Sequence, residues 1–235
     1  MNKGFYKDLD INFEEALKMS SKDFNHNELI FMLQNGNIPE KQIAALKLSS
    51  IDNDDDASVL ISNLTGCDGK IREAVALKIK ELLFANPNLY TKFNYPEIFA
   101  NATIDINANI CRTVIDCLDI LKQDKNFAQN YMNKILEFIN QVFLELDKFI
   151  FKDKKYLINK QLFKLYWALE ALKNFVNIID QDILYSILSR TANEREYTIR
   201  EKTAQIIVNL DHEIYNNLKK MLKNDENYYV RIVFQ

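Results

Sequence analysis

The first candidate for metal chemistry is a run of acidic residues, Asp52-Asn53-Asp54-Asp55-Asp56. Calcium-binding loops of twelve residues use such oxygen ligands, and they need Gly at the sixth position and Glu at the twelfth. Counted from Asp52, this chain has Ala57 and Asn63 at those two positions. The run is therefore predicted to be an acidic turn in which Asp56 caps the next helix, and we expect no bound metal and no cofactor.

A second candidate is a segment, residues 148–156, that mixes lysines with aromatic rings. Proteins that bind single-stranded nucleic acid combine cations with rings on which bases stack. The alternative is that Phe149 and Phe151 are apolar anchors at the tip of a long helical hairpin and the lysines its solvated edge. We favour this second interpretation and keep part of the segment as a candidate interaction surface: Lys152, Lys154, Lys155 and Tyr156.

The remaining reactive side chains form no catalytic pattern. Cys67, Cys111 and Cys117 lack the spacings of zinc and redox sites, and they are expected to be free thiols. His26 and His212 lie far apart in the sequence, with no evident Cys or Asp arrangement for a metal. The chain also has no Gly-rich phosphate loop, no nucleophile elbow and no His-Glu-x-x-His motif. We therefore predict no catalytic residues.

Four aromatic residues fall within one expected helix, residues 156–178. An aromatic stripe at helical spacing more often packs into a core than forms a ligand cage, so we predict core packing. The four residues are Phe163, Tyr166, Trp167 and Phe175.

The clearest helix in the sequence is the stretch from Gly69 to Leu83, which contains strong helix formers and no interior breaker. Asp68 can accept a hydrogen bond from a free backbone N–H at the helix start. Its apolar residues cover a broader face than a surface helix needs, so we expect coverage on two sides. The residues of this face are Ile71, Ala74, Val75, Ala76, Leu77, Ile79, Leu82 and Leu83.

The pattern of a cation followed by aliphatic residues recurs along the chain. We find six such positions, separated by 31, 40, 48, 40 and 31 residues. These steps lie near the roughly 34 to 47 residues of helical repeats. The six cations are Lys41, Arg72, Arg112, Lys160, Arg200 and Arg231.

Two of these stretches, Ile71-Arg72-Glu73-Ala74-Val75-Ala76-Leu77 and Thr198-Ile199-Arg200-Glu201-Lys202-Thr203-Ala204, resemble the second helix of a HEAT repeat. The resemblance covers most of the chain after about residue 25 and implies a solenoid of stacked helical hairpins. In that family an Asp in the turn and an Arg opening the second helix bond along the stack as a ladder. The ladder residues implied here are Asp68, Arg72, Arg112, Arg200 and Arg231. Because Lys160 lacks the two-pronged donor of Arg, the ladder is expected to break in the middle.

Composition supports an all-α chain, since 48% of the residues are hydrophobic and only 4 Gly and 3 Pro are present for turns. We expect one domain over residues 1–235, with residues 1–24 as an N-terminal capping segment. After a first helix at 12–20, six hairpins are expected: 27–35 with 39–50, 56–64 with 69–85, 96–103 with 107–122, 126–148 with 156–178, 181–190 with 196–210, and 212–223 with 227–235.

Charge and hydropathy limit the partners. The net charge of −3 does not favour nucleic acid as the main partner, although residues 1–150 carry 16 basic and 22 acidic groups and residues 151–235 carry 14 and 11. No apolar run reaches the length of about 18 residues that a membrane span needs, and no signal peptide is evident, so a cytoplasmic location is expected.

Two function classes follow from the resemblance. The first is a non-catalytic scaffold or adaptor that binds a protein or peptide on the surface of the solenoid. The second is a HEAT-like DNA-binding enzyme of the alkylpurine DNA glycosylase type, which would need a basic groove that the negative total charge does not favour. A HEAT architecture does not decide between them, because the fold carries many functions.

The segment 228–234 is a dense apolar run that includes Tyr228, Tyr229 and Phe234. Three explanations are open: the natural protein continues beyond it, another copy covers it, or it folds back onto the helix at 212–223. Exposed apolar patches usually mark interaction sites, and two-fold pairing is the commonest way to close one. We therefore expect self-association through residues 228–234.

Overall fold

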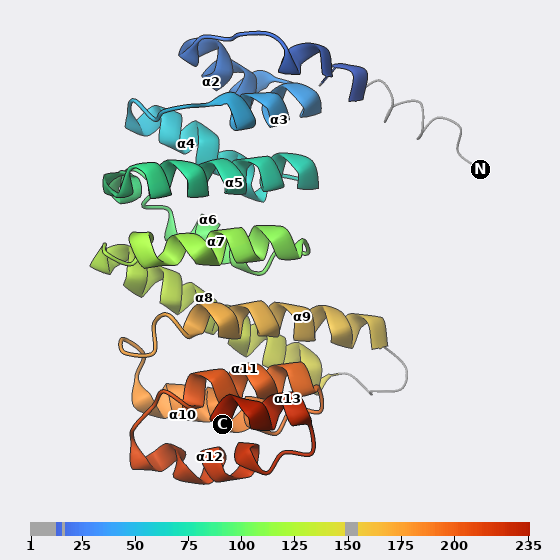
Figure 1. Ribbon diagram of the computed structural model, residues 1–235, viewed down its shortest axis with the longest axis vertical. Coiled ribbons are helices and arrows are strands. Elements are labelled where there is room, and N and C mark those ends of the chain that lie inside the picture. The colour runs from blue at the N-terminus through green and yellow to red at the C-terminus, as the bar shows by residue number, and fades with distance from the viewer. Residues whose placement is uncertain (1–12, 16, 149–154) are drawn as a thin grey trace, which may run out of the picture. The chain divides into compact units, whose positions relative to one another are not determined.

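The computed structural model describes residues 13–15, 17–148 and 155–235. These residues form α-helices and short 3-10 helices joined by turns, and no strand occurs among them (Figure 1). The all-α prediction is therefore confirmed for the described part of the chain. The chain divides into two compact units, Met1–Ala128 and Gln129–Gln235, which we describe separately.

In the first unit, residues 13–15 and 17–20 are helical and six α-helices follow before the boundary. The helices are α2 (His26–Asn35), α3 (Ile38–Lys47), α4 (Asp54–Ser62), α5 (Gly69–Ala85), α6 (Pro96–Thr103) and α7 (Ala108–Leu121), with 3-10 turns η1 (Asn63–Thr65) and η2 (Pro87–Thr91). Helix α8 (Lys125–Asp147) begins in this unit, and most of it belongs to the second.

Polar side chains at the helix starts explain where these helices begin. Asn25 and Asn37 each cap a helix and form a capping box with the Glu three residues later. Asp68 Oδ1 accepts hydrogen bonds from the backbone N–H groups of Lys70 and Ile71 at 2.9 and 3.0 Å, as the sequence predicts. Each cap satisfies backbone donors that a helix start leaves without partners.

Helix α5 lies in the middle of the first unit and packs against α3 and α7. Val75, Ile79 and Leu83 are almost completely buried on this helix. Leu77, however, is 49% exposed, so the expected coverage on two sides is wrong at this position. The apolar stripe of α5 is broad enough to reach both neighbouring helices, and Leu77 lies beyond it on the open side.

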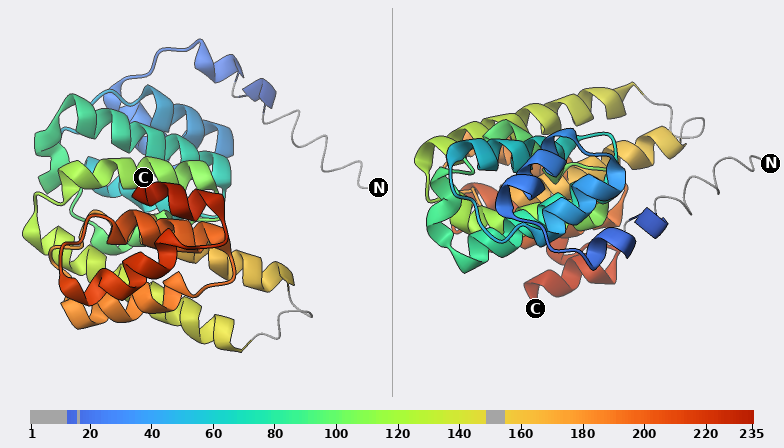
Figure 2. Two further views of the ribbon diagram at one scale, coloured as in Figure 1. Left: turned by 60° about the horizontal axis from the view of Figure 1, so that its bottom comes forward. Right: turned by 90° about the horizontal axis from the view of Figure 1, so that it is seen from above.

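The second unit contains most of α8 and five further α-helices. They are α9 (Lys155–Leu172), α10 (Gln181–Ala192), α11 (Tyr197–Ile207), α12 (Asn216–Lys223) and α13 (Tyr228–Arg231), with 3-10 turns η3 (Glu213–Tyr215) and η4 (Ile232–Phe234). Helix α11 packs against α9, α10, α12 and α13, and Figures 1 and 2 show it beside α13.

Helix α9 ends at Leu172, six residues earlier than the sequence predicts. Asn174 lies in the turn that follows, where its side-chain amide donates to the carbonyls of Glu170 and Ala171 at 3.5 and 3.4 Å. Asn competes for backbone partners in this way and so favours turns over helix interiors. Among the described helices, none combines the length and the apolar character that crossing a membrane requires.

Candidate functional site

Arg72, in the first turn of α5, uses both edges of its guanidinium. Its Nη1 donates to the carbonyls of Gly66 and Cys67 at 2.8 and 3.0 Å, in the turn before its own helix. Its Nε and Nη2 donate to the two carboxylate oxygens of Asp105 at 2.7 and 3.1 Å, in the turn before α7. The Arg72 and Asp105 side chains are each only 10% exposed. This two-pronged pair, which we call an Arg fork, connects successive turns and is occupied by structural contacts.

Arg200 forms a second Arg fork in the other unit. Its Nη1 donates to the carbonyls of Glu194 and Arg195, both at 2.9 Å, and its Nε and Nη2 donate to Asp225 at 2.7 and 3.0 Å. The hydrogen bonds from Arg200 hold the pKa of Asp225 below its usual value, and those to Asp225 raise the pKa of Arg200. The two forks therefore have the same hydrogen-bond arrangement at two different places in the chain.

The acidic partners differ from the one that the resemblance implied. Asp68 only caps α5, whereas Asp105 and Asp225 come from the turn after the next helix. Each of these two accepts a 2.8 Å hydrogen bond from the backbone N–H of an Asn two residues later, and that Asn caps the following helix. An Asp-x-Asn motif before a helix is the sequence signal that these two share, and the same motif also occurs at residues 23–25 before α2.

Arg112 does not take part in a ladder. Its side chain is exposed and makes no hydrogen bond or ion pair within the described residues. The residue that occupies the equivalent place is Cys111, because its backbone N–H bonds to the carbonyl of the cap residue Asn107, as that of Arg72 bonds to Asp68. The Cys111 Sγ lies 3.1 Å from the carbonyl oxygen of Asp105, and burial raises its pKa to about 12. The expected position was wrong by one residue.

The two lysines at the remaining cation positions behave differently from each other. Lys41 Nζ donates to Asn63 Oδ1 at 3.1 Å, and Asn63 in turn donates to the carbonyls of Leu33 and Val59. Lys160 is exposed on α9 and has no ion pair within the described residues. Neither lysine can form a two-pronged fork.

Arg231 repeats half of the fork. Its Nη1 donates to the carbonyls of Asp225 and Glu226 at 2.6 and 2.8 Å, in the turn before α13. Its Nε and Nη2, the atoms that bind a carboxylate in the two complete forks, have no partner among the residues that the structure describes. We call Arg231 and the exposed side chains around it, Glu226, Tyr228, Tyr229 and Ile232, the Arg231 edge.

The apolar run at 228–234 is partly covered by its own unit. Val230 is completely buried where α13 packs against α11 and α12. Tyr229 stacks on Tyr197 with ring centres 6.1 Å apart, yet it remains 58% exposed, and Tyr228 is 54% exposed. Lys223 Nζ lies 5.8 Å from the ring centre of Phe234.

A recess of about 470 Å³ opens along α9 beside the start of α11, and we call it the α9 recess. The expected core packing is confirmed for Trp167 and Phe175, which are 7% and 3% exposed, but Phe163 and Tyr166 are half-buried in the recess wall. The Nε1 of Trp167 is buried and has no hydrogen-bond partner in the described structure. The lining residues are Asn159, Leu162, Phe163, Tyr166, Trp167, Glu196 and Thr198.

The wall of the α9 recess is held by charged neighbours. Lys202 on α11 forms an ion pair with Glu170 and lies 4.7 Å from the ring centre of Tyr166. Of the four residues proposed as an interaction surface from the sequence, Lys155 and Tyr156 begin α9 and are exposed. The other two, Lys152 and Lys154, lie outside the described residues.

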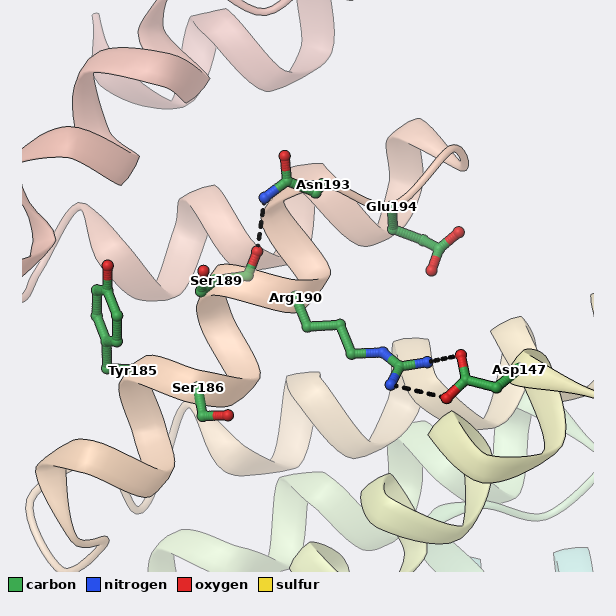
Figure 3. Close-up of a pocket in the computed structure, with 7 residues that line it drawn as sticks. All are labelled: Asp147, Tyr185, Ser186, Ser189, Arg190, Asn193 and Glu194. Atoms are coloured by element: carbon green, nitrogen blue, oxygen red, sulfur yellow. Dashed lines mark hydrogen bonds and ion pairs between the residues drawn. The ribbon is translucent and has the colours of Figure 1, made fainter.

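A larger cleft of about 750 Å³, with a more polar lining than the α9 recess, lies along α10. Figure 3 shows Arg190 reaching from α10 toward Asp147, with two contacts at 2.6 and 3.2 Å. Arg190 also donates to the carbonyl of Phe143 and lies 4.1 Å from the centre of its ring. Ser186 and Ser189 line the same cleft, but neither is bonded to a His or carboxylate in the described structure.

His26 lies next to two carboxylates, which the sequence did not indicate. Its Nε2 is 2.9 Å from Asp56 Oδ2 and 3.6 Å from Asp52 Oδ2. Burial disfavours the charged form of Asp56, but the bonds from His26 and from the backbone of Asp52 hold its pKa below the usual value. The cap of α4 is Asn53, not Asp56 as predicted. His26 begins α2 and Asp56 lies in the first turn of α4, so the hydrogen bond between them connects these two helices.

Comparison with known proteins adds no family to this description. No protein-family model matches the chain, and no curated protein matches it either.

Proposed function

We propose that this chain is a non-catalytic, HEAT-like scaffold that binds a protein or peptide segment in the α9 recess. The observation that carries the proposal is the half-buried aromatic wall formed by Phe163 and Tyr166 in front of Trp167. A recess of about 470 Å³ lies within the roughly 300 to 1,000 Å³ of typical ligand sites. Its size suits one or two large apolar side chains of a partner.

Aromatic rings favour this use of the recess. They supply a large apolar contact area with few rotatable bonds, so ordering them on binding costs little entropy. Tyr166 is already restrained by Lys202, which lies 4.7 Å from its ring centre and is paired with Glu170. A partner side chain would therefore meet a wall that is largely formed in advance.

Polar groups at the rim favour a polypeptide as the ligand. Asn159 offers an amide, and Glu196 offers a carboxylate at the start of α11. Glu196 occupies the cap position of α11, yet its side chain makes no capping hydrogen bond. These groups are suited to the N–H and C=O groups of a peptide backbone or to a basic side chain beside the apolar anchor.

Many of the cationic side chains already form ion pairs with acidic residues, which weighs against the nucleic-acid alternative. Arg72, Arg190 and Arg200 are each paired with an Asp. Several lysines are paired with acids as well: Lys78, Lys80, Lys122, Lys134, Lys148 and Lys202. DNA would have to replace these pairs, and its affinity depends on cations that are free to contact phosphates.

The test is selection of peptides from a displayed random library, followed by titration of a selected peptide. Trp167 is the single Trp of the chain, so its fluorescence reports directly on the recess. Phe163→Ala and Tyr166→Ala should each weaken binding at least about fivefold, as anchor residues do. Phe84→Ala, a change to an exposed ring in the other unit, is the control and should leave the affinity unchanged.

Two outcomes would contradict the proposal. One is a selected peptide whose affinity is insensitive to both recess variants while circular dichroism shows them folded. The other is retention on a DNA column at low salt that fades steeply as salt is added, which would favour the DNA-binding class.

A further inference from the structure

The Arg231 edge carries an unfilled half of an otherwise repeated interaction. In both complete forks, Nη1 is held by the carbonyls six and five residues before the Arg, and the Nε–Nη2 side binds a carboxylate. Arg231 has the same two carbonyl contacts, to Asp225 and Glu226. Its second side is without a partner among the described residues.

The geometry of the guanidinium fixes what this side can bind. The group is planar and permanently charged, so once Nη1 is held, the direction of the Nε and Nη2 hydrogens is set. These two parallel donors match the two oxygens of a carboxylate. The Arg231 edge is therefore a preformed site for the side chain of an Asp or Glu.

The same edge also presents a carboxylate. The Glu226 side chain is 90% exposed, and its one ion pair within the described residues is a 3.5 Å contact with Nη2 of Arg200, which is already bonded to Asp225. Glu226 is thus free to pair elsewhere at little cost. An edge that carries both a vacant donor pair and an exposed acceptor is self-complementary, which is the requirement for a two-fold interface.

We infer that a second copy of this chain occupies the Arg231 edge, and that Arg231 of each copy binds Glu226 of the partner subunit. Tyr228, Tyr229 and Ile232, which are 54%, 58% and 41% exposed, then pack across the two-fold axis. Arg and Tyr are among the residues most enriched at the energetic centres of interfaces. This pairing is separate from peptide binding in the α9 recess, and either can fail without the other.

The experiment measures the mass of the purified chain by light scattering and sedimentation from about 1 to 100 μM. The wild type should be a dimer that weakens as salt increases, because the pair is charged. Glu226→Arg places a cation opposite Arg231 and should weaken the dimer at least about tenfold. Glu213→Arg, the same charge change at another exposed position of this unit, should not.

A second arm tests the pairing directly. Arg231→Glu should also be monomeric alone, but mixing it with Glu226→Arg should restore a mixed dimer, since opposite charges then face each other in both contacts. If Arg231→Glu does not fold by circular dichroism, the comparison of Glu226→Arg with Glu213→Arg decides the question. A wild-type monomer at 100 μM, or a dimer equally sensitive to both Glu variants, overturns the inference.

Discussion

Replacing Arg72 by Ala removes all four hydrogen bonds of the first Arg fork at once. Among the described residues, the carboxylate of Asp105 would keep only the backbone N–H of Asn107, at 2.8 Å, and would remain a mostly buried charge without a cation. The carbonyls of Gly66 and Cys67 would lose their donor. The change is therefore expected to destabilise the first unit mainly because the Asp105 carboxylate and the two carbonyls lose their hydrogen-bond donors. The loss of contacts made by the Arg72 side chain itself should matter less.

The magnitude follows from burial. Removing one partner of a buried ion pair costs about 3 to 5 kcal/mol, and side chains that are 10% exposed are close to that case. Arg72→Lys keeps the charge but cannot form two parallel contacts, so we expect a smaller loss of about 1 to 3 kcal/mol. Arg112→Ala is the matched control, because it removes the same charge from an exposed side chain and should change stability by less than about 0.5 kcal/mol.

The assay is urea denaturation followed by circular dichroism, with the Asp105→Asn variant added to complete a double-mutant cycle. Asp105→Asn and Arg72→Ala together should cost less than the sum of the two single changes, because each single change leaves an unpaired charge. The affinity of a peptide selected for the α9 recess should stay within about twofold. An Arg72→Ala cost equal to that of Arg112→Ala would refute the reasoning.

Three further predictions concern other parts of the chain. Leu82→Ala should cost about 2 to 5 kcal/mol of unfolding free energy, whereas Leu77→Ala should cost much less, because the two side chains are 6% and 49% exposed. The lowered pKa of Asp225 means that its pair contributes stability fully above the ordinary carboxyl pKa of about 3.9 and loses it as pH falls through the lower folded-state pKa, so Asp225→Asn should flatten the stability-against-pH curve below about pH 4. In a thiol titration at pH 8, the exposed Cys67 should react quickly, while Cys111, buried and with a pKa raised to about 12, should react only on unfolding.

Helix positions could be predicted from the sequence because they depend on local signals. Asp68 caps α5 through hydrogen bonds that reach only two and three residues along the chain. Asn37 and Glu40 form a capping box over the same short distance. Because such contacts join residues that are close in the sequence, helix starts can be predicted from residue types and their spacing.

The partners of the arginines were missed because they lie far along the chain. Asp105 is 33 residues from Arg72, and Asp225 is 25 residues from Arg200. The bond between His26 and Asp56 spans 30 residues. A turn with several polar residues does not reveal which one faces a neighbouring helix, because that depends on how the helices pack.

The error at Arg112 has a different cause. The apolar residues that follow it fit a helix in either of two adjacent phases, and the presence of a cation favoured the wrong one. The cap at Asn107 fixes the phase, since the equivalent residue is always four positions after the cap, at Arg72, Cys111, Arg200 and Arg231. Counting from the cap would have placed Cys111 correctly.

The second Arg fork has a consequence for the entropy of binding. Arg200 holds the carbonyls of Glu194 and Arg195, and the next residue along the chain is Glu196, which lines the α9 recess. A turn fixed in this way has already lost its backbone freedom, at about 1 to 2 kcal/mol per residue, before any ligand arrives. A peptide would then bind in the recess without having to order the turn that contains Glu196. The hydrogen bonds of Arg200 that stabilise the folded second unit would therefore also lower the entropy cost of peptide binding.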